Sequence, residues 1–455
     1  MKTKLFYLVF IFCIGVYGQN KQVLYDFAGL PQTLLLNPGL ETNYKYHIGV
    51  PMLSGFSSEI GSTGFTVSDL FAADNRDITD KVTAVLANIS TSDFLSINAK
   101  IDVINIGYRL DDKTYLSGGF YNEVDGIGYL PKDGITLINE GNAAYLNKSF
   151  SASQILYKLD YLGVIHAGIT RKIDDNLTLG GRFKIYSSSL NVESTNNTGT
   201  FTSNLGNNNI YVHYLENIDI NFRTSGLIKD NEYINDASTY IGNTFFGGNM
   251  GVGLDFGLSY NFSPQLQFSA SLLDIGFINH TKNIKNTITK GSFTFEGIAF
   301  DYDTNNTNYW QNLNDAFEEQ LPTEENQDSY ISWRPAKFNA AIKYSFGEKR
   351  SKYCYDDTYK DFFTDAFGAQ LYSVFRPLRQ QFAFTVFYEK SFSNKLHAKL
   401  TYTVDDFSYS NIGFGISTQI WKINFYGLVD NITELSDISS ANNVSLQFGF
   451  NLLFN

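Results

Sequence analysis

The residues of this chain that could carry chemistry do not form a catalytic motif. The five histidines have no spacing typical of metal ligands, and they are His47, His166, His213, His280 and His397. The Gly-x-Ser-x-Gly turn that positions a nucleophilic serine does not occur, and the glycines follow strand spacing rather than that of a phosphate-binding loop. We therefore expect no enzyme, no catalytic residue and no cofactor.

One acidic segment resembles a cation site. Asp301-Tyr302-Asp303-Thr304-Asn305 is similar to the start of a calcium-binding loop, but Asn306 and Asn312 stand where that loop needs Gly and Glu. The acidic run from Glu318 to Asp328 belongs to the same region, where a solvated loop or cation bridging to surface polysaccharide would explain it. The sequence therefore predicts no metal site.

A second group of charged residues alternates with apolar ones, so all of its members face one side of their segments. Because ionised groups cannot face lipid cheaply, these residues predict a polar lumen inside a barrel whose apolar side chains point outward. Both signs are present, which favours a network of internal salt bridges; a selectivity lining for a small solute is the alternative. The candidates are Lys100, Asp102, Arg182, Lys184, Asp255, Lys337 and Lys343.

The elements that would position these charges are strands. From Val444 to Phe454 every second residue is apolar, and similar alternation recurs along the chain. A soluble β-sandwich has the same period. Runs of about 10 to 14 residues, aromatic residues at their tips, and short turns alternating with long loops favour a transmembrane antiparallel β-barrel.

Placing the short turns on the periplasmic side gives an even count of about 14 strands, as single-chain bacterial barrels require. We assign 189–249 to an external hairpin or folded loop, and Phe293 to Tyr302 to the external part of 278–335. If both crossed the membrane, the barrel would have 16 strands. The predicted strands are 43–54, 96–109, 113–124, 159–171, 176–188, 250–262, 265–277, 336–346, 364–375, 381–391, 395–406, 410–419, 421–430 and 442–454.

The N-terminal residues predict export. Lys2 and Lys4 precede a short apolar run, and Val16-Tyr17-Gly18 suits cleavage, so residues 1–18 read as a signal peptide. Residues 19–42 would then lie in the lumen or at its periplasmic mouth, and 43–455 would form the barrel. A short amphipathic helix is expected over Asn75 to Ile89, capped by Asp74 or Asp77.

These features predict the outer membrane of a Gram-negative cell, with lipid and the barrel-insertion machinery as partners. The formal net charge of −12 argues against nucleic acid as a partner, because nucleic-acid binding needs a basic surface.

Several motifs bring a family to mind. They are Leu35-Leu36-Asn37-Pro38-Gly39, Ile48-Gly49-Val50-Pro51, the run from Phe94 to Asp102, Tyr129-Leu130-Pro131-Lys132-Asp133, Asn176 to Lys184, Leu272 to Ile278, and the ending from Ile412 to Asn451. The chain resembles an uncharacterised, domain-of-unknown-function family of outer-membrane barrels. It is more distantly similar to PorP/SprF-type barrels of type IX secretion and gliding and to PorV/FadL-like barrels. That resemblance implies 14 strands and an inward N-terminal segment, and it assigns no site residue.

The sequence supports two functional hypotheses. The first is an accessory protein whose long loops engage envelope partners, linked to secretion or surface assembly. The alternative is a porin-like channel or FadL-like transporter for a small amphipathic or hydrophobic solute.

Overall fold

A computed structural model describes residues 21–207, 211–229, 232–296, 309–350 and 361–454. The predicted signal peptide and the calcium-like segment 301–305 lie outside these residues. Fourteen antiparallel strands form a closed barrel, because the last strand pairs with the first. The wall consists of β1 (Tyr46–Gly49) with β2 (Phe56–Ser62), β3 (Phe94–Arg109), β4 (Thr114–Tyr129), β6 (Tyr157–Lys172), β7 (Leu177–Ser194), β12 (Asn249–Asn261), β13 (Leu266–His280), β17 (Lys337–Arg350) with β16 (Tyr330–Trp333), β18 (Asp361–Phe375), β19 (Gln380–Ser393), β20 (Leu396–Val404), β21 (Asn411–Ile420), β22 (Ile423–Asp430) and β23 (Asn443–Phe454).

The predicted count of 14 is therefore confirmed, and one strand is corrected. The sequence pattern predicts a continuous first strand over 43–54. Instead β1 ends at Gly49, the chain leaves the regular wall, and β2 begins at Phe56. Pro51 explains part of this break, since proline has no N–H to give to a neighbouring strand.

The outer surface of the barrel is apolar. Along β12, Val252, Leu254 and Phe256 are exposed on the outside, while Asp255 is fully buried within. The same alternation runs around the wall, with exposed Ile106, Leu179, Ile342, Phe367, Val386, Leu400, Phe414 and Leu446. Such a belt requires a hydrocarbon solvent, so the chain folds as a transmembrane barrel.

Short turns gather at one end of the barrel. Asp111 and Asp174 each accept a hydrogen bond from the backbone N–H two residues later, at 2.8 Å in both cases. Ser263 closes a third turn, in which Leu266 N–H donates to its carbonyl at 3.2 Å. These turns fall in the gaps between the predicted strands, after residues 109, 171 and 262.

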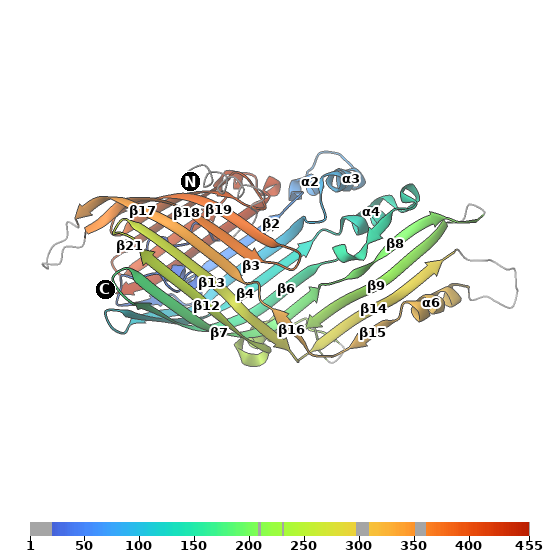
Figure 1. Cartoon of the computed structure of the whole chain (residues 1–455), viewed down its shortest axis with the longest axis horizontal. Coiled ribbons are helices and arrows are strands. Elements are labelled where there is room, and N and C mark those ends of the chain that lie inside the picture. The colour runs from blue at the N-terminus through green and yellow to red at the C-terminus, as the bar shows by residue number, and fades with distance from the viewer. Residues whose placement is uncertain (1–20, 208–210, 230–231, 297–308, 351–360, 455) are drawn as a thin grey trace, which may run out of the picture.

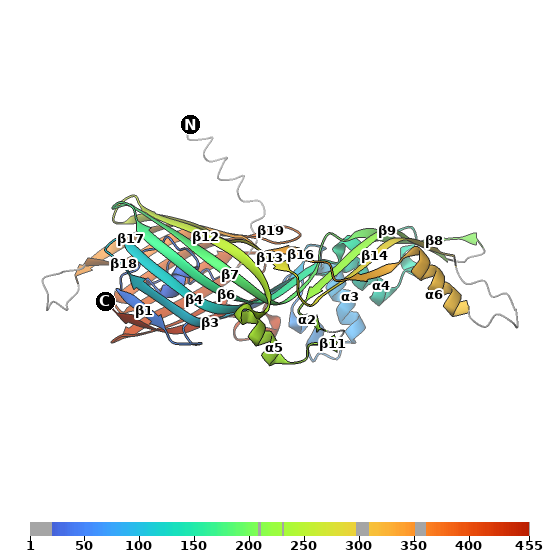
Figure 2. The same cartoon turned by 90° about the horizontal axis from the view of Figure 1, so that it is seen from below.

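At the other end, a long twisted sheet extends far beyond the barrel (Figures 1 and 2). The end of β7 continues into it by pairing with β9, and the order across it is β5-β8-β9-β14-β15. Neither the hairpin predicted within 189–249 nor the strand from Phe293 enters the barrel wall, so the 16-strand alternative is wrong. We call the sheet beyond the barrel the external sheet. Its strands are β5 (Ser149–Ser151), β8 (Thr198–Leu205), β9 (Tyr211–Ser225), β14 (Ile284–Phe295) and β15 (Thr323–Asn326). A separate hairpin consists of β10 (Ile228–Lys229) and β11 (Glu232–Tyr233).

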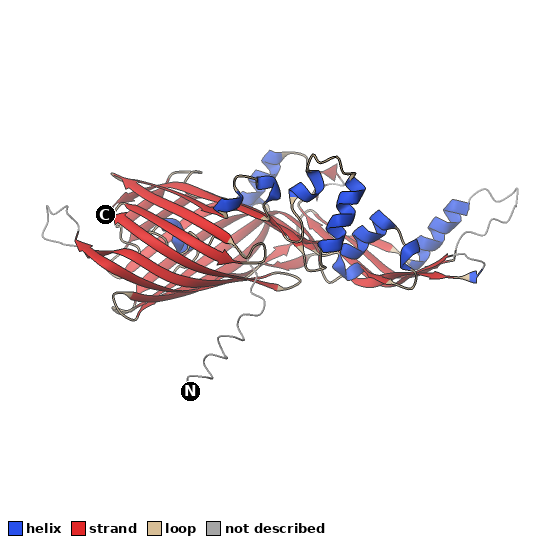
Figure 3. Ribbon diagram, turned by 90° about the horizontal axis from the view of Figure 1, so that it is seen from above, coloured by secondary structure: helices blue, strands red, loops and turns tan. Residues whose placement is uncertain are grey.

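Apart from the single turn at Pro31–Leu35, which lies inside the barrel, the helices lie at the mouth of the barrel and along this sheet (Figure 3). The helix predicted over Asn75 to Ile89 is confirmed as α3, and Asp77 is its cap, accepting from Thr79 N–H at 2.8 Å. Among the described residues, no helix is both long and apolar enough to cross a bilayer. The helices are α2 (Val67–Phe71), α3 (Ile78–Asn88), α4 (Lys132–Glu140), α5 (Ala237–Gly242) and α6 (Tyr309–Gln320), with single turns η1 (Pro31–Leu35), η2 (Ala143–Tyr145), η3 (Ala152–Gln154), η5 (Asn243–Gly247), η6 (Ile432–Glu434) and η7 (Ile438–Ser440).

Candidate functional site: a plugged and charged lumen

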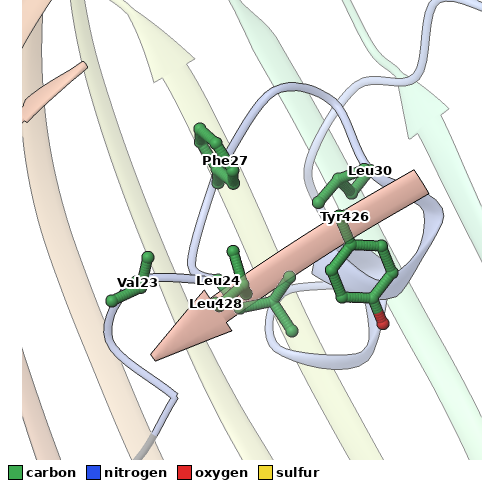
Figure 4. Close-up of a cluster of buried hydrophobic side chains, with 6 residues drawn as sticks. All are labelled: Val23, Leu24, Phe27, Leu30, Tyr426 and Leu428. Carbon is green, nitrogen blue, oxygen red and sulfur yellow. The ribbon is translucent and has the colours of Figure 1, made fainter. Parts of the chain in front are cut away.

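Residues 21–42, called the plug below, lie inside the barrel. The plug carries an apolar cluster that packs against Tyr426 and Leu428 of β22 (Figure 4), and its members are Val23, Leu24, Phe27 and Leu30. All four are at most 5% exposed. A barrel of this size has room in its interior, and the plug fills that room with protein rather than water.

The plug is held mainly through its backbone. Buried carbonyl groups need partners, and polar side chains of the wall supply them. The donors are Lys399 to Tyr25 at 2.6 Å, Ser271 to Leu36 at 2.6 Å, Thr170 to Pro38 at 2.7 Å, Ser259 to Gly39 at 2.8 Å, and Arg182 to Leu34. The polar inward face of the strands is thus matched to this one segment.

At the Pro38-Gly39 turn the plug backbone touches the wall. A Cβ added to Gly180 of β7 would overlap the Pro38 carbonyl, and one added to Gly257 of β12 would overlap the Asn37 side chain. Glycine is required at both positions because the two backbones approach so closely.

We expect Gly180→Val to displace the turn from the wall while leaving the barrel folded. The measurement is hydrogen exchange of residues 34–42, which should speed up because Thr170 and Ser259 lose their acceptors. Gly427→Val is the matched control, since a Cβ there meets only Phe425, at an ordinary contact distance of 3.7 Å. Equal exchange in both variants would contradict this account of the close approach.

The lumenal charges form a connected ladder of ion pairs. Asp255 pairs with Arg182 at 3.0 Å and Lys184 at 2.9 Å. Lys184 also reaches Asp274 at 2.6 Å, and Asp274 pairs with Lys337 at 3.0 Å. Each of these side chains is at most 11% exposed. The ladder joins the neighbouring strands β7, β12, β13 and β17 along the lumenal face of the wall.

The ladder continues toward the external sheet. Arg334, which follows β16, pairs with Glu123 at 2.8 Å and Asp160 at 3.3 Å, and Lys337 approaches Glu123 at 3.7 Å. We call the set Glu123, Asp160, Arg182, Lys184, Asp255, Asp274, Arg334 and Lys337 the charge network. It contains four acidic and four basic groups, so the charges within it balance.

The structure places all seven lumenal candidates from the sequence on inward faces, although not in one group. Four of them belong to the charge network: Arg182, Lys184, Asp255 and Lys337. Lys100 and Asp102 pair with each other at 3.3 Å on β3, and Lys343 pairs with Asp26 of the plug at 2.5 Å.

Sequence reasoning missed Glu123, Asp160, Asp274 and Arg334. Asp274 sits at a β-bulge with φ of +57°, so its strand does not alternate regularly there. Arg334 follows exposed Ile331 and Trp333 at the right period, and that alternation could have revealed it.

Small cavities remain between the plug and the wall. One of about 50 Å³ is bordered by charged side chains, among them Lys21, Lys100, Glu123, Lys184 and Lys337. Another of about 30 Å³ lies behind Gly55 and Phe56 of the wall. Spaces of this size hold one or a few water molecules. In the described part of the chain, no three His, Cys, Asp or Glu side chains come together in a way that could hold a metal ion.

The break between β1 and β2 produces an excursion of the wall. Between Gly49 and Phe56 the chain takes seven residue steps, whereas β23 takes three between the paired positions Asn451 and Phe448. Met52 and Leu53 are 60% and 48% exposed on the outside. From within, Gln32 of the plug donates to the Ser54 carbonyl at 2.7 Å. We call residues 50–55 the wall excursion.

The sequence of residues 38–430 matches the model of a family of unknown function, DUF5723. The chain belongs to this family. The resemblance to an uncharacterised family of barrels is thereby confirmed. No curated protein matches the chain.

Among solved structures, this DUF5723 protein is similar to FadL-like barrels. The Pseudomonas putida toluene transporter TodX is 8% identical, with 97% of this chain and 95% of TodX covered at a TM-score of 0.42. A Pseudomonas aeruginosa FadL homologue is 9% identical, with 97% and 100% covered at a TM-score of 0.43. The RagAB peptide transporter is 8% identical, with 84% and 61% covered at a TM-score of 0.21.

Proposed function

We propose that this protein is an outer-membrane transporter for a small hydrophobic or amphipathic solute, which leaves the lumen sideways through the wall. The wall excursion carries this proposal. It is the place where the barrel wall departs most from regular pairing, and a side chain of the plug holds it from inside. Movement of the plug and movement of the wall would therefore be coupled.

The contents of the lumen favour a route that opens transiently rather than a permanently open pore. The plug and the charge network occupy the interior, and their buried hydrogen bonds and ion pairs resist passive flow of water and ions. A hydrophobic solute would gain nothing from crossing so polar a lumen completely. It would gain free energy by passing outward between β2 and β23 into the bilayer.

The excursion is closed in this conformation. Val50 N–H donates to Phe450 at 3.0 Å, and Phe450 N–H donates to Leu53 at 2.8 Å. Only these few bonds join residues 50–55 to β23, so opening would cost less here than along a regular strand pair. Gln32 adds a reciprocal amide pair to Asn451 of β23, at 2.8 and 3.1 Å. The plug thus ties both sides of the proposed exit together.

A covalent link between positions 32 and 451 should stop transport. In a Cys354→Ser background, the variant Gln32→Cys with Asn451→Cys would be joined by a short bis-methanethiosulfonate, which forms a reducible disulfide with each thiol and releases sulfinate. We expect intact Gram-negative cells producing the barrel to take up N-phenyl-1-naphthylamine faster than cells without it. Crosslinking should abolish that difference, and a reducing agent should restore it.

A matched crosslink separates locking from general stiffening. Thr385 and Thr403 face each other on β19 and β20, with their hydroxyl oxygens 2.8 Å apart, and neither is hydrogen-bonded to the described residues of the plug. Joining Thr385→Cys to Thr403→Cys should leave uptake unchanged. Undiminished uptake after the Gln32–Asn451 crosslink would refute the sideways route.

The accessory role in secretion or surface assembly stays a prediction, as do the envelope partners and the cleavage of the signal peptide. The expectation that the protein is not an enzyme also stays a prediction. Repeated recovery of one envelope protein with the gently solubilised barrel would support the accessory role.

A further inference from the structure

The external sheet has an aromatic face on the side toward α6. Residues paired across neighbouring strands share a face. Phe150, Phe201, Leu215 and Phe293 form one such row across β5, β8, β9 and β14. Ser203, His213 and Phe295 form the next row across β8, β9 and β14.

A groove of about 400 Å³ lies on this face, within the size range of small-molecule sites. Phe317 of α6 closes one side, with its ring 5.2 Å from that of Phe293. The groove is lined by Phe201, His213, Leu215, Phe293, Phe295, Asn314 and Phe317. Among the residues that the structure describes, this lining contains neither Lys nor Arg.

His213 is the polar group placed among these rings. Its imidazole stacks between Phe201, at 5.8 Å and 19° between planes, and Phe295, at 5.9 Å and 13°. A histidine packed between two aromatic rings is fixed in orientation and cannot swing out to solvent without breaking both stacks.

The hydrogen bonds of His213 show which nitrogen of its neutral ring carries the proton. Its Nδ1 lies 3.2 Å from Asn142 Nδ2 and 2.9 Å from Ser203 Oγ. An amide nitrogen only donates, so Nδ1 must accept, and the proton of the neutral ring resides on Nε2.

The Nε2–H donor remains available. Within the described part of the chain, Nε2 forms no hydrogen bond to a side chain or to the backbone. It is also not a buried atom, so a ligand can reach it. The groove thus presents the His213 Nε2–H donor among apolar side chains, and its other described polar group is the Asn314 amide, which donates to Glu318 at 2.7 Å.

We propose that this groove binds a small neutral aromatic ligand that carries a hydrogen-bond acceptor, with His213 Nε2–H donating to a carbonyl or ether oxygen. The rings of Phe201, Phe293 and Phe317 supply the apolar contact. A carboxylate is disfavoured, because burial of its charge would be uncompensated. Binding stands on the groove alone, whereas a role as the capture site of the transporter rests on the proposed function.

The test uses the purified full-length barrel held in amphipol. Fluorine NMR would follow 4-fluoroacetophenone, 4-fluoroethylbenzene and 4-fluorobenzoate, which share a ring but differ in acceptor and charge. We expect the ketone to bind more tightly than the hydrocarbon, and the benzoate to bind least. Phe293→Ala should weaken both neutral probes, which separates groove binding from partition into amphipol.

His213→Phe isolates the hydrogen bond, because it keeps an aromatic ring between Phe201 and Phe295. The variant should weaken ketone binding up to about tenfold, the worth of one neutral hydrogen bond, and leave the hydrocarbon unchanged. Equal loss of both neutral probes in His213→Phe, or unchanged binding in Phe293→Ala, would overturn the proposal.

The two proposals can fail separately. If ketone binding follows these predictions while the Gln32–Asn451 crosslink leaves uptake intact, only the sideways transport route is refuted. If the crosslink stops uptake and the groove variants bind all probes as the unaltered protein does, only the groove proposal is refuted.

Discussion

Replacing Asp274 with Asn is expected to lower the free energy of unfolding by about 3–5 kcal/mol, the usual cost of removing one partner from a buried ion pair. Asp274 accepts from Lys184 at 2.6 Å, Lys337 at 3.0 Å and the Tyr186 hydroxyl at 3.2 Å. The neutral amide keeps the shape and removes the charge, so Lys184 and Lys337 remain buried with less compensation. Urea titration of the barrel in lipid vesicles, followed by its gel mobility without heating, would measure the loss.

Two further variants give this prediction its controls. Asp175→Asn should not change the urea midpoint, because Asp175 is fully exposed and reaches Lys172 only at 4.0 Å. The double variant Asp274→Leu with Lys184→Met should be more stable than Asp274→Asn, since it removes one of the stranded cations. A loss of stability no larger in Asp274→Asn than in Asp175→Asn would mean that water hydrates the network freely.

The strand count and the polarity of the two faces could be predicted from the sequence, because a membrane wall imposes alternation on every strand. Ionised residues at alternating positions cannot face the lipid and must face the lumen, so Arg182 and Asp255 could be assigned to the lumen. Their mutual pairing could not be predicted. It joins residues far apart in the chain and depends on the register between neighbouring strands.

Local irregularities of the strands explain why Asp274 was missed and why the first predicted strand was wrong. Asp274 occupies a bulge, where alternation fails to tell inside from outside. In the first strand, Pro51 was a signal that the regular wall ends, yet the apolar residues around it also fit a strand. The wall excursion could therefore not be predicted, because the residues around Pro51 are as apolar as those of a strand.

The plug shows a different limit of sequence reasoning. Its apolar residues, such as Leu24 and Phe27, require burial, but either the lumen or a surface at the periplasmic mouth could provide it. What places the plug inside is a set of wall donors, such as Lys399, whose spacing matches its carbonyls only in the folded barrel. No periodicity in the plug itself encodes that match.

Deleting residues 21–42 is expected to turn the barrel into an ion-conducting pore. The apolar cluster of the plug would be lost, and wall donors such as Lys399 and Ser271 would face water instead of plug carbonyls. A polar lumen tolerates this exchange, because water can satisfy those groups. Planar-bilayer recordings should show persistent steps for the deletion and few for the intact chain.

The Phe27→Ala variant is the control, because it removes apolar contact while every backbone hydrogen bond of the plug is kept. It should remain closed to ions, although its plug should exchange hydrogen faster. If the deletion variant folds and still fails to conduct, the charge network closes the lumen without the plug. In that case the Asp274→Asn variant should conduct once the plug is removed, since the ion pairs of Asp274 with Lys184 and Lys337 that hold the network together would be weakened.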